Sequence, residues 1–203
     1  MAEIATDGRV LRGARNREAI IDAMLAFYRA GVLRPTAQQV AERAGVAPRS
    51  VFHHFADMEG LVAEVSARQA HEHGHLMNAP DVDGPLAERV AALVTRRAEL
   101  FEAVAPVRRA ALLEAHRSPT VRRNLATLAR RLRAQLETLF APELRPRRTR
   151  AGLLETLDLL TSWEAWDRLR TDQGLDASAA RTTLTTTITT LLTTPLPKTK
   201  ETT

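Results

Sequence analysis

Hydrophobic positions recur with the spacing of an α-helix along almost the whole chain. A first apolar stripe predicts a helix from about Arg15 to Ala30, and it consists of Ala19, Ile20, Ala23, Met24 and Phe27. We find no convincing segment with the strict apolar–polar alternation of a half-buried strand. The pattern therefore predicts an all-α protein.

Polar and glycine residues punctuate the next three helices. Thr36 and Gln39 have the spacing of a capping box, in which each side chain satisfies a backbone N–H at the helix start. Gly45 should end that helix after about nine residues. Pro48 suits the first position of a third helix, and Asp57 can cap a longer fourth helix. Two short helices around a glycine turn match the helix-turn-helix pattern.

The segment "NAPDVDGP", residues 78–85, interrupts the helical pattern strongly. We expect residues 1–60 to hold an N-terminal arm and the helix-turn-helix domain, and residues 61–203 to form a helical domain. The fourth helix should bridge the two. Further helices should be separated at four places, which are residues 103–106, 116–119, 141–146 and 172–176.

The last two helices are predicted from about Arg148 to Gln173 and from Ala177 to Leu192. The second of these is rich in threonine, which has low helix propensity, so it should form only when it packs against a partner surface. Past Pro195 we expect disorder.

Composition narrows the class of protein. The 203 residues contain no cysteine, which excludes disulfides and thiolate metal sites, and no stretch approaches the ~20 apolar residues of a membrane span. The N-terminus lacks an apolar signal core, so a cytoplasmic protein is expected. The net charge of +5 is concentrated in residues 8–55, which hold eight arginines against three acids. That distribution suits a polyanionic partner.

The histidine pair in "SVFHHFAD", residues 50–57, has two open interpretations. Val51 and Phe55 are four apart and should face the core, while Arg49 and His53 share an exposed face. Adjacent histidines point about 100° apart on a helix, which argues against a shared metal ion. His54 is either a packing residue or, like His53, a surface contact to DNA.

A second histidine group lies in "AHEHGH", where His71 and His75 have a spacing that could bind zinc on a helix. Fraying near Gly74 and the missing third ligand count against that site, and we expect no metal and no cofactor.

The stretch "TAQQVAERAGVAPRSVFHHFADMEGLVAEV", residues 36–65, closely resembles the DNA-binding signature of the tetracycline-repressor (TetR) family. The resemblance extends back to about residue 12. It implies a homodimeric transcriptional repressor that small ligands release from a palindromic operator in double-stranded DNA. It also implies that the DNA-contacting residues are Thr36, Ala37, Gln38, Pro48, Arg49, Ser50, Phe52, His53 and His54.

The chain departs from the family pattern at four positions. Phe52 stands where tyrosine is common, Ala56 and Met58 where lysine is frequent, and Ala47 where serine often caps the recognition helix. Phosphate anchoring must then rely on backbone N–H groups at the second helix, on Thr36 or Gln38, and on N-terminal arginines.

Dimerisation and effector binding are expected of the C-terminal helices. Candidate interface residues, which could equally be core within one chain, are Leu157, Leu160, Trp163, Leu184, Ile188 and Leu191. Candidate effector-pocket residues are Phe101, Leu112, Leu113, His116 and Trp166.

Two alternative functions remain open at this stage. One is an all-helical enzyme or ligand-binding protein that uses the helix-turn-helix only as a scaffold, although the sequence shows no nucleophile–base motif and no phosphate-binding glycine loop. The other is a dimeric DNA-binding protein without any effector.

Overall fold

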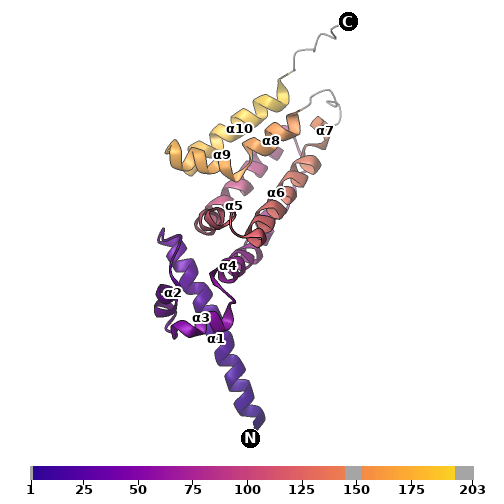
Figure 1. The fold of residues 1–203 in the computed structure, drawn as a ribbon. Coiled ribbons are helices and arrows are strands. Elements are labelled where there is room, and N and C mark those ends of the chain that lie inside the picture. The colour runs from indigo at the N-terminus through magenta and orange to yellow at the C-terminus, as the bar shows by residue number, and fades with distance from the viewer. Residues whose placement is uncertain (1, 145–151, 195–203) are drawn as a thin grey trace. The chain divides into compact units, whose positions relative to one another are not determined.

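The computed structural model describes residues 2–144 and 152–194, with side chains from residue 10 onward. Within those ranges every regular element is helical, as the periodicity predicts (Figure 1). The predicted disorder past Pro195 lies outside the described residues.

The helices pack as two compact units. The first contains the chain up to Gly74 together with Ala103–Leu125, and the second contains His75–Glu102 and the chain from Ala126 onward. The predicted domain boundary at residue 60 stays a prediction, because these units are defined by packing alone.

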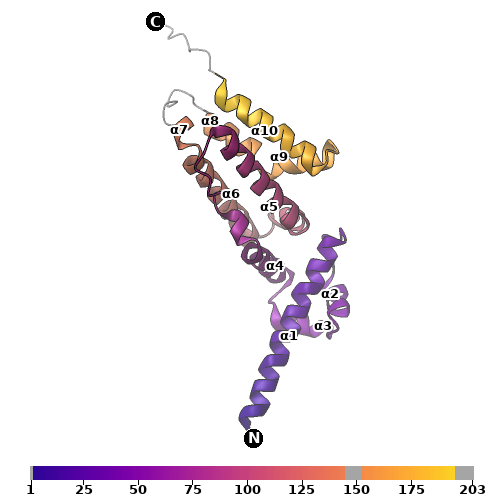
Figure 2. The ribbon, with the colours of Figure 1, turned by 180° about the vertical axis from the view of Figure 1, so that it is seen from behind.

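The N-terminal unit begins with four helices, which are α1 (Ala2–Arg29), α2 (Ala37–Ala44), α3 (Pro48–His54) and α4 (Met58–Glu72). In Figures 1 and 2, α2 and α3 lie beside the C-terminal half of α1. The predicted start of α1 near residue 15 is wrong. The apolar stripe marks only the packed part of this helix, and each further residue adds a hydrogen bond to a helix already nucleated.

The predicted caps of α2 and α4 and the predicted first residue of α3 are confirmed. Thr36 Oγ1 accepts from the N–H of Gln39 at 3.2 Å, and Gln39 Oε1 accepts from the N–H of Thr36 at 2.8 Å. Gly45 ends α2 with φ of 68°, a left-handed conformation that favours glycine. Pro48 opens α3, and Asp57 Oδ1 accepts from the N–H of Gly60 at 2.7 Å.

One hydrophobic core joins α1 to α4 with the end of α5 (Leu86–Glu114) and the start of α6 (Pro119–Leu139). Its largest fully buried side chains include Ile20, Ile21, Met24, Tyr28 and Leu61. The contributions of α5 and α6 are Val107, Ala110, Ala111 and Val121. The core of the N-terminal unit is therefore completed by segments distant in sequence, while α4 lies wholly inside this unit.

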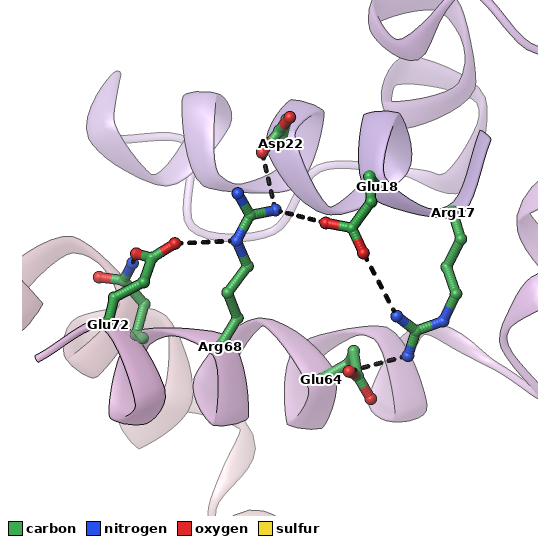
Figure 3. Close-up of polar contacts among 7 residues, drawn as sticks. Arg17, Glu18, Asp22, Glu64, Arg68 and Glu72 are labelled. Atoms are coloured by element: carbon green, nitrogen blue, oxygen red, sulfur yellow. Dashed lines mark hydrogen bonds and ion pairs between the residues drawn. The ribbon is translucent and has the colours of Figure 1, made fainter. Parts of the chain in front are cut away.

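A network of charged side chains joins the surfaces of α1 and α4 (Figure 3). Arg68 forms ion pairs with Glu18 (3.0 Å), Asp22 (2.9 Å) and Glu72 (2.9 Å). The hydrogen bond to Glu72 is the main cause of a raised pKa for Arg68, which burial partly opposes. Arg17 pairs with Glu64 at 2.8 Å on the same two helices. The network fixes α4 against α1 at two points.

The second unit contains the first part of α5 and most of α6, followed by shorter helices. Its other elements are the 3-10 turn η1 (Gly74–Met77), α7 (Ala141–Leu144), α8 (Leu153–Leu160), α9 (Trp163–Asp167), the π-helical turn η3 (Arg168–Asp172) and α10 (Ala177–Thr193). Figure 2 shows α10 alongside α8 and α9. The predicted breaks at 116–119 and 172–176 are confirmed.

Two predicted helix boundaries are wrong. The expected break at residues 103–106 is absent, because α5 continues through Pro106. Proline inside a helix costs ~3 kcal/mol or more, and here burial of Val104 and Val107 on either side offsets that cost. The single helix expected from Arg148 to Gln173 is divided, because Ser162 Oγ accepts from the N–H of Ala165 and starts α9.

The threonine-rich helix α10 forms with one buried face. Asp176 caps it by accepting from the N–H of Ala179 at 2.8 Å. Several threonine hydroxyls donate to the carbonyl four residues earlier, including those of Thr183 and Thr187. The buried side chains are Ala180, Leu184, Ile188 and Leu192. Packing of this face supplies the stability that the threonine propensity lacks.

The left-handed conformation of Gly45 gives a test of the turn between α2 and α3. Gly45→Ala should lower the free energy of unfolding by about 1–2 kcal/mol, because a side chain strains this backbone conformation. Gly60→Ala is the matched control, since Gly60 is helical and an added Cβ would lie at an ordinary 3.5 Å from Asp57 Oδ1. It should raise stability by about 0.4–1 kcal/mol. Urea unfolding followed by circular dichroism measures both, and equal effects would contradict the assigned turn.

The network around Arg68 should be visible as salt-dependent stability. Arg68→Met leaves the carboxylates of Glu18, Asp22 and Glu72 without their shared cation, so we expect a loss of about 1–2 kcal/mol at low salt. Because salt screens exposed charges, the loss should shrink near 1 M NaCl. Arg131→Met removes an exposed arginine from α6 and serves as the control. A loss independent of salt would show that Arg68 acts through packing of its stem.

Candidate nucleic-acid interface

The helix α3 has one face buried in the N-terminal unit. Val51 is 0% exposed and Phe55 is 6% exposed. The N–H of Phe55 donates to the carbonyl of Val51 at 2.9 Å and closes the last turn. A helix of seven residues is not stable in isolation, so the burial of these two side chains fixes where α3 lies.

The opposite face of α3 is open to solvent. Pro48, Arg49 and His53 are exposed, and Phe52 keeps 54% of its surface accessible. Ser50 is half-buried. A cation, an imidazole and an aromatic ring thus stand together on a helix narrow enough for the major groove. Their contact with DNA stays a prediction.

The two adjacent histidines have different surroundings. His53 is exposed, whereas His54 is half-buried, and their rings meet edge to face with centroids 5.2 Å apart. Burial lowers the pKa of His54, and the charges of His53 and Arg17 lower it further. A Cβ added at Gly13 would come within 4.0 Å of His54 Cε1, so this ring lies near α1. His54 therefore has the setting of a neutral packing residue.

The N-terminus of α2 lies outside the core. Thr36 and Gln38 are exposed and Ala37 is half-buried. The capping box occupies the N–H groups of Thr36 and Gln39, and Gln38 Nε2 donates to Glu42 Oε1 at 2.9 Å. The N–H groups of the first helical turn have no acceptor within the helix, which makes this end suited to an anion.

The N-terminal arginines are not equivalent. Arg17 is one of the N-terminal arginines expected to anchor phosphates, but it is ion-paired with Glu64, and its guanidinium carbon lies 5.3 Å from the centroid of the Phe55 ring. Arg12 and Arg15 are exposed on α1, and the side chain of Arg9 lies outside the described residues. Arg17 can therefore contact a phosphate only if its ion pair with Glu64 breaks.

The six predicted interface residues differ in exposure. Leu157, Trp163, Leu184 and Ile188 are buried within the single chain, while Leu160 and Leu191 are half-buried. Leu159 on α8 is 66% exposed, and sequence reasoning missed it because it falls outside the apolar stripe. The dimer interface itself stays a prediction.

The five predicted pocket residues do not form one group. Phe101 and Trp166 are buried in the second unit, where Phe101 meets Trp163 edge to face and Trp166 Nε1 donates to Glu102 Oε1 at 2.9 Å. Leu112, Leu113 and His116 are exposed and belong to the N-terminal unit. Their role in a pocket stays a prediction.

Neither a metal cluster nor a membrane span is present in the part of the chain that is described. No group of three or more His, Asp or Glu side chains there could hold a metal ion. Helix α4 ends at Glu72, close to the fraying expected near Gly74, so His71 and His75 do not lie on one helix. None of the described helices has the length and apolarity needed to cross a bilayer.

Sequence reasoning also missed two arginines of α5 that the structure places in the second unit. Arg97 is 3% exposed, and Arg89 forms a bidentate pair with Glu143. The burial of Arg97 could have been predicted from its position in the sequence. It lies four residues from both Leu93 and Phe101, on the apolar stripe of the helix.

Comparison with known proteins identifies the N-terminal segment. Residues 20–65 match the sequence model of bacterial regulatory proteins of the tetR family. This range contains the packed part of α1 and all of α2 and α3. No curated protein matches the chain by sequence.

Several solved structures share the fold over most of the chain. The transcriptional regulator SCO7518 of Streptomyces coelicolor is 27% identical, with a TM-score of 0.61, 89% of this chain and 99% of that chain covered. A TetR-family transcriptional regulator from Rhodococcus sp. is 18% identical, with a TM-score of 0.66 and coverage of 88% and 99%. The multidrug binding protein EbrR, solved with imidazole, is 22% identical, with a TM-score of 0.61 and coverage of 91% and 95%.

These findings exclude one of the functions that the sequence left open. Regulators of the tetR family are not enzymes, so the alternative of an all-helical enzyme is wrong. The matched segment coincides with the helix-turn-helix whose exposed face is described above. The helix-turn-helix segment of this chain is that of TetR-family transcriptional regulators, and most of the chain shares the fold of solved regulators of this kind.

Proposed function

We propose that the protein is a homodimeric repressor that binds a palindromic operator and leaves it when a small-molecule effector binds. The observation that carries this proposal is the exposed face of α3, where Arg49, Phe52 and His53 stand above a buried Val51 and Phe55. Its partner is double-stranded DNA, and the match to bacterial regulators supports a place in the cytoplasm, where bacterial DNA lies.

Arg49 is the residue that reads a base. A guanidinium pairs with O6 and N7 of guanine in the major groove through two parallel hydrogen bonds. Arg49 lies at the second position of α3 and is exposed, so nothing in its own unit covers it. His53, one turn further along, contacts a neighbouring base edge or phosphate, and Phe52 packs against a thymine methyl group.

The start of α2 holds the DNA backbone. The first-turn N–H groups at Ala37 and Gln38 face a phosphate, with the hydroxyl of Thr36 beside them. This arrangement compensates for Ala56 and Met58, where lysines would supply phosphate charges in the family pattern. Contacts of this kind position α3 without reading sequence.

Dimerisation follows from the small size of the reading helix. One short helix buries too little surface for tight binding, and two copies on a twofold axis read both half-sites of a palindrome. Four of the six candidate residues already pack within one chain, so we propose that the surface is formed by Leu159, Leu160 and Leu191 on α8 and α10. Two helices from each subunit would form the interface.

The dimer exists in two conformations, and only one of them has the two α3 helices spaced to fit the operator. The effector binds the other conformation, so the population shifts toward it and the dimer leaves the DNA. We place the effector site in the second unit, near Phe101 and Trp166. A solved neighbour of the same fold is a multidrug binding protein, which supports ligand binding as a use of this architecture. A DNA-binding protein without effector is the alternative, and ligand-induced release distinguishes the two.

The role of Arg49 is testable on an operator recovered by selection from random DNA. Arg49→Ala should weaken operator binding by ~1–3 kcal/mol, about 5-fold to 150-fold in Kd, and relax preference at one position of each half-site. Arg29→Ala removes the same charge from the exposed end of α1 and should change Kd little. Fluorescence anisotropy at fixed salt measures both. Equal weakening on all sequences would make Arg49 a phosphate contact.

The dimer surface is testable by charge insertion. Leu159→Glu places a carboxylate on the proposed interface and should convert the dimer into monomers with loss of operator binding, because an unpaired buried charge opposes association. Leu11→Glu, at a comparably exposed leucine of α1, is the control and should stay dimeric. Sedimentation velocity gives the answer. An intact Leu159→Glu dimer would remove α8 from the interface.

A further inference from the structure

Arg97 is a buried cation in the apolar interior of the second unit. It lies on α5 and is 3% exposed, less than most of the leucines of that helix. Its neighbours one turn away on the same stripe are Leu93 and Phe101, which are also buried. A charged side chain is rarely this buried unless it is paired, because water solvates it far better than hydrocarbon does.

The guanidinium of Arg97 is only partly satisfied. Its Nη2 donates to the carbonyl of Leu132 on α6 at 2.7 Å. Its Nε and Nη1 have no hydrogen-bond partner among the described residues. Two of the three nitrogen atoms therefore stand in the interior with unused donors.

The acid whose charge acts on Arg97 is already engaged with another arginine. Asp158 on α8 is the acidic side chain whose charge acts on Arg97, but its carboxylate forms an ion pair with Arg133 at 3.6 Å. Burial lowers the pKa of Arg97 to about 10, and Asp158 opposes this shift. Arg97 thus stays positively charged at neutral pH, with no carboxylate of its own.

Arg89 on the same helix is a half-buried arginine whose three side-chain nitrogen atoms all have hydrogen-bond partners. Its Nη1 and Nη2 contact the two carboxylate oxygens of Glu143, its Nη1 also contacts the carbonyl of Leu139 at 2.7 Å, and its Nε contacts the carbonyl of Gly84 at 3.0 Å. All three nitrogen atoms have partners. Against this standard, Arg97 lacks one anion.

We propose that Arg97 binds the negatively charged group of the effector, and that the effector is a small apolar monocarboxylate. The single positive charge matches a single negative charge, and among the described residues no other arginine is buried that could help to hold a phosphate dianion. The buried residues one turn away along α5 are apolar or aromatic, namely Leu93, Leu100 and Phe101, and the ring of Phe101 meets that of Trp163 with centroids 5.8 Å apart. They suit a hydrocarbon body next to the charged group.

This assignment rests on the proposed effector-controlled function and adds the chemical class of the ligand. It also explains why the chain keeps a buried charge that lowers the stability of the protein without ligand. Replacing a buried ion by an apolar side chain of similar volume is often stabilising. If Arg97 served only to join α5 to α6 through the carbonyl of Leu132, its replacement by an apolar side chain would instead lower the stability of the protein.

The experiment compares the full-length protein with its Arg97→Met and Arg96→Met variants. Thermal unfolding is followed with a series of monocarboxylates from acetate to decanoate and benzoate, with the matching neutral amides, and with sodium phosphate and sodium chloride at equal ionic strength. Arg96 is the matched control, since it lies on the same helix but donates to the carbonyl of His75 near the surface.

Three results are expected. Arg97→Met melts at a higher temperature than the wild type without ligand. Some carboxylates, but not their amides, raise the melting temperature of the wild type and of Arg96→Met. Titration calorimetry then gives a Kd about 10-fold to 100-fold weaker for Arg97→Met, because the carboxylate loses a charged hydrogen-bond partner.

Other results overturn the assignment. A lower melting temperature for Arg97→Met would make the residue a structural tie. Equal shifts with acids and amides would place the ligand elsewhere, and an Arg97-dependent shift with phosphate or chloride alone would indicate an inorganic anion site. Operator binding is measured separately. Carboxylate binding at Arg97 without release of DNA would refute the effector role in the proposed function while the anion site stands.

Discussion

The burial of Val51 and Phe55 is the contact on which the proposed DNA-reading surface depends. The seven residues of α3 cannot hold a helix alone, so their position comes from the core of α1, α2 and α4. Because the two buried side chains are four residues apart, the remaining faces of α3 must point outward. Arg49, Phe52 and His53 are exposed for that reason. The side chains that we propose to read DNA are therefore those that the core of this unit excludes.

The same core extends into α5 and α6. Val107, Ala110 and Val121 belong to the cluster that supports α3, and Arg34 reinforces it by pairing with Glu114 at 3.0 Å. The hydroxyl of Ser118 in the turn between α5 and α6 contacts the carboxylate of Glu59 on α4. Changes at the end of α5 therefore act on the packing of the DNA-binding helices inside a single unit. Since a close-packed core does not deform continuously, such changes should move the DNA-binding helices between distinct packing arrangements.

Charge is distributed in this protein according to two different requirements. On the surface of α1 and α4, Arg17 and Arg68 are surrounded by acids and fix the two helices together. Inside the second unit, Arg89 is fully paired whereas Arg97 is not. The first three arginines stabilise the fold through partners within the chain. A buried arginine without such a partner is a cost to folding, which a function in ligand binding would offset.

The sequence by itself determined the helical class, the capped α2, the proline at the start of α3 and the two faces of α3, because these depend on neighbours within a few residues. It did not determine that α5 passes Pro106, that Ser162 divides a longer helix, or that Arg17 is paired with Glu64. It also could not show that Leu157 and Ile188 are buried while Leu159 is exposed. Each of these depends on side chains brought together from distant parts of the chain. Local energies of about 1 kcal/mol are readily outweighed by such packing, so only the tertiary structure decided them.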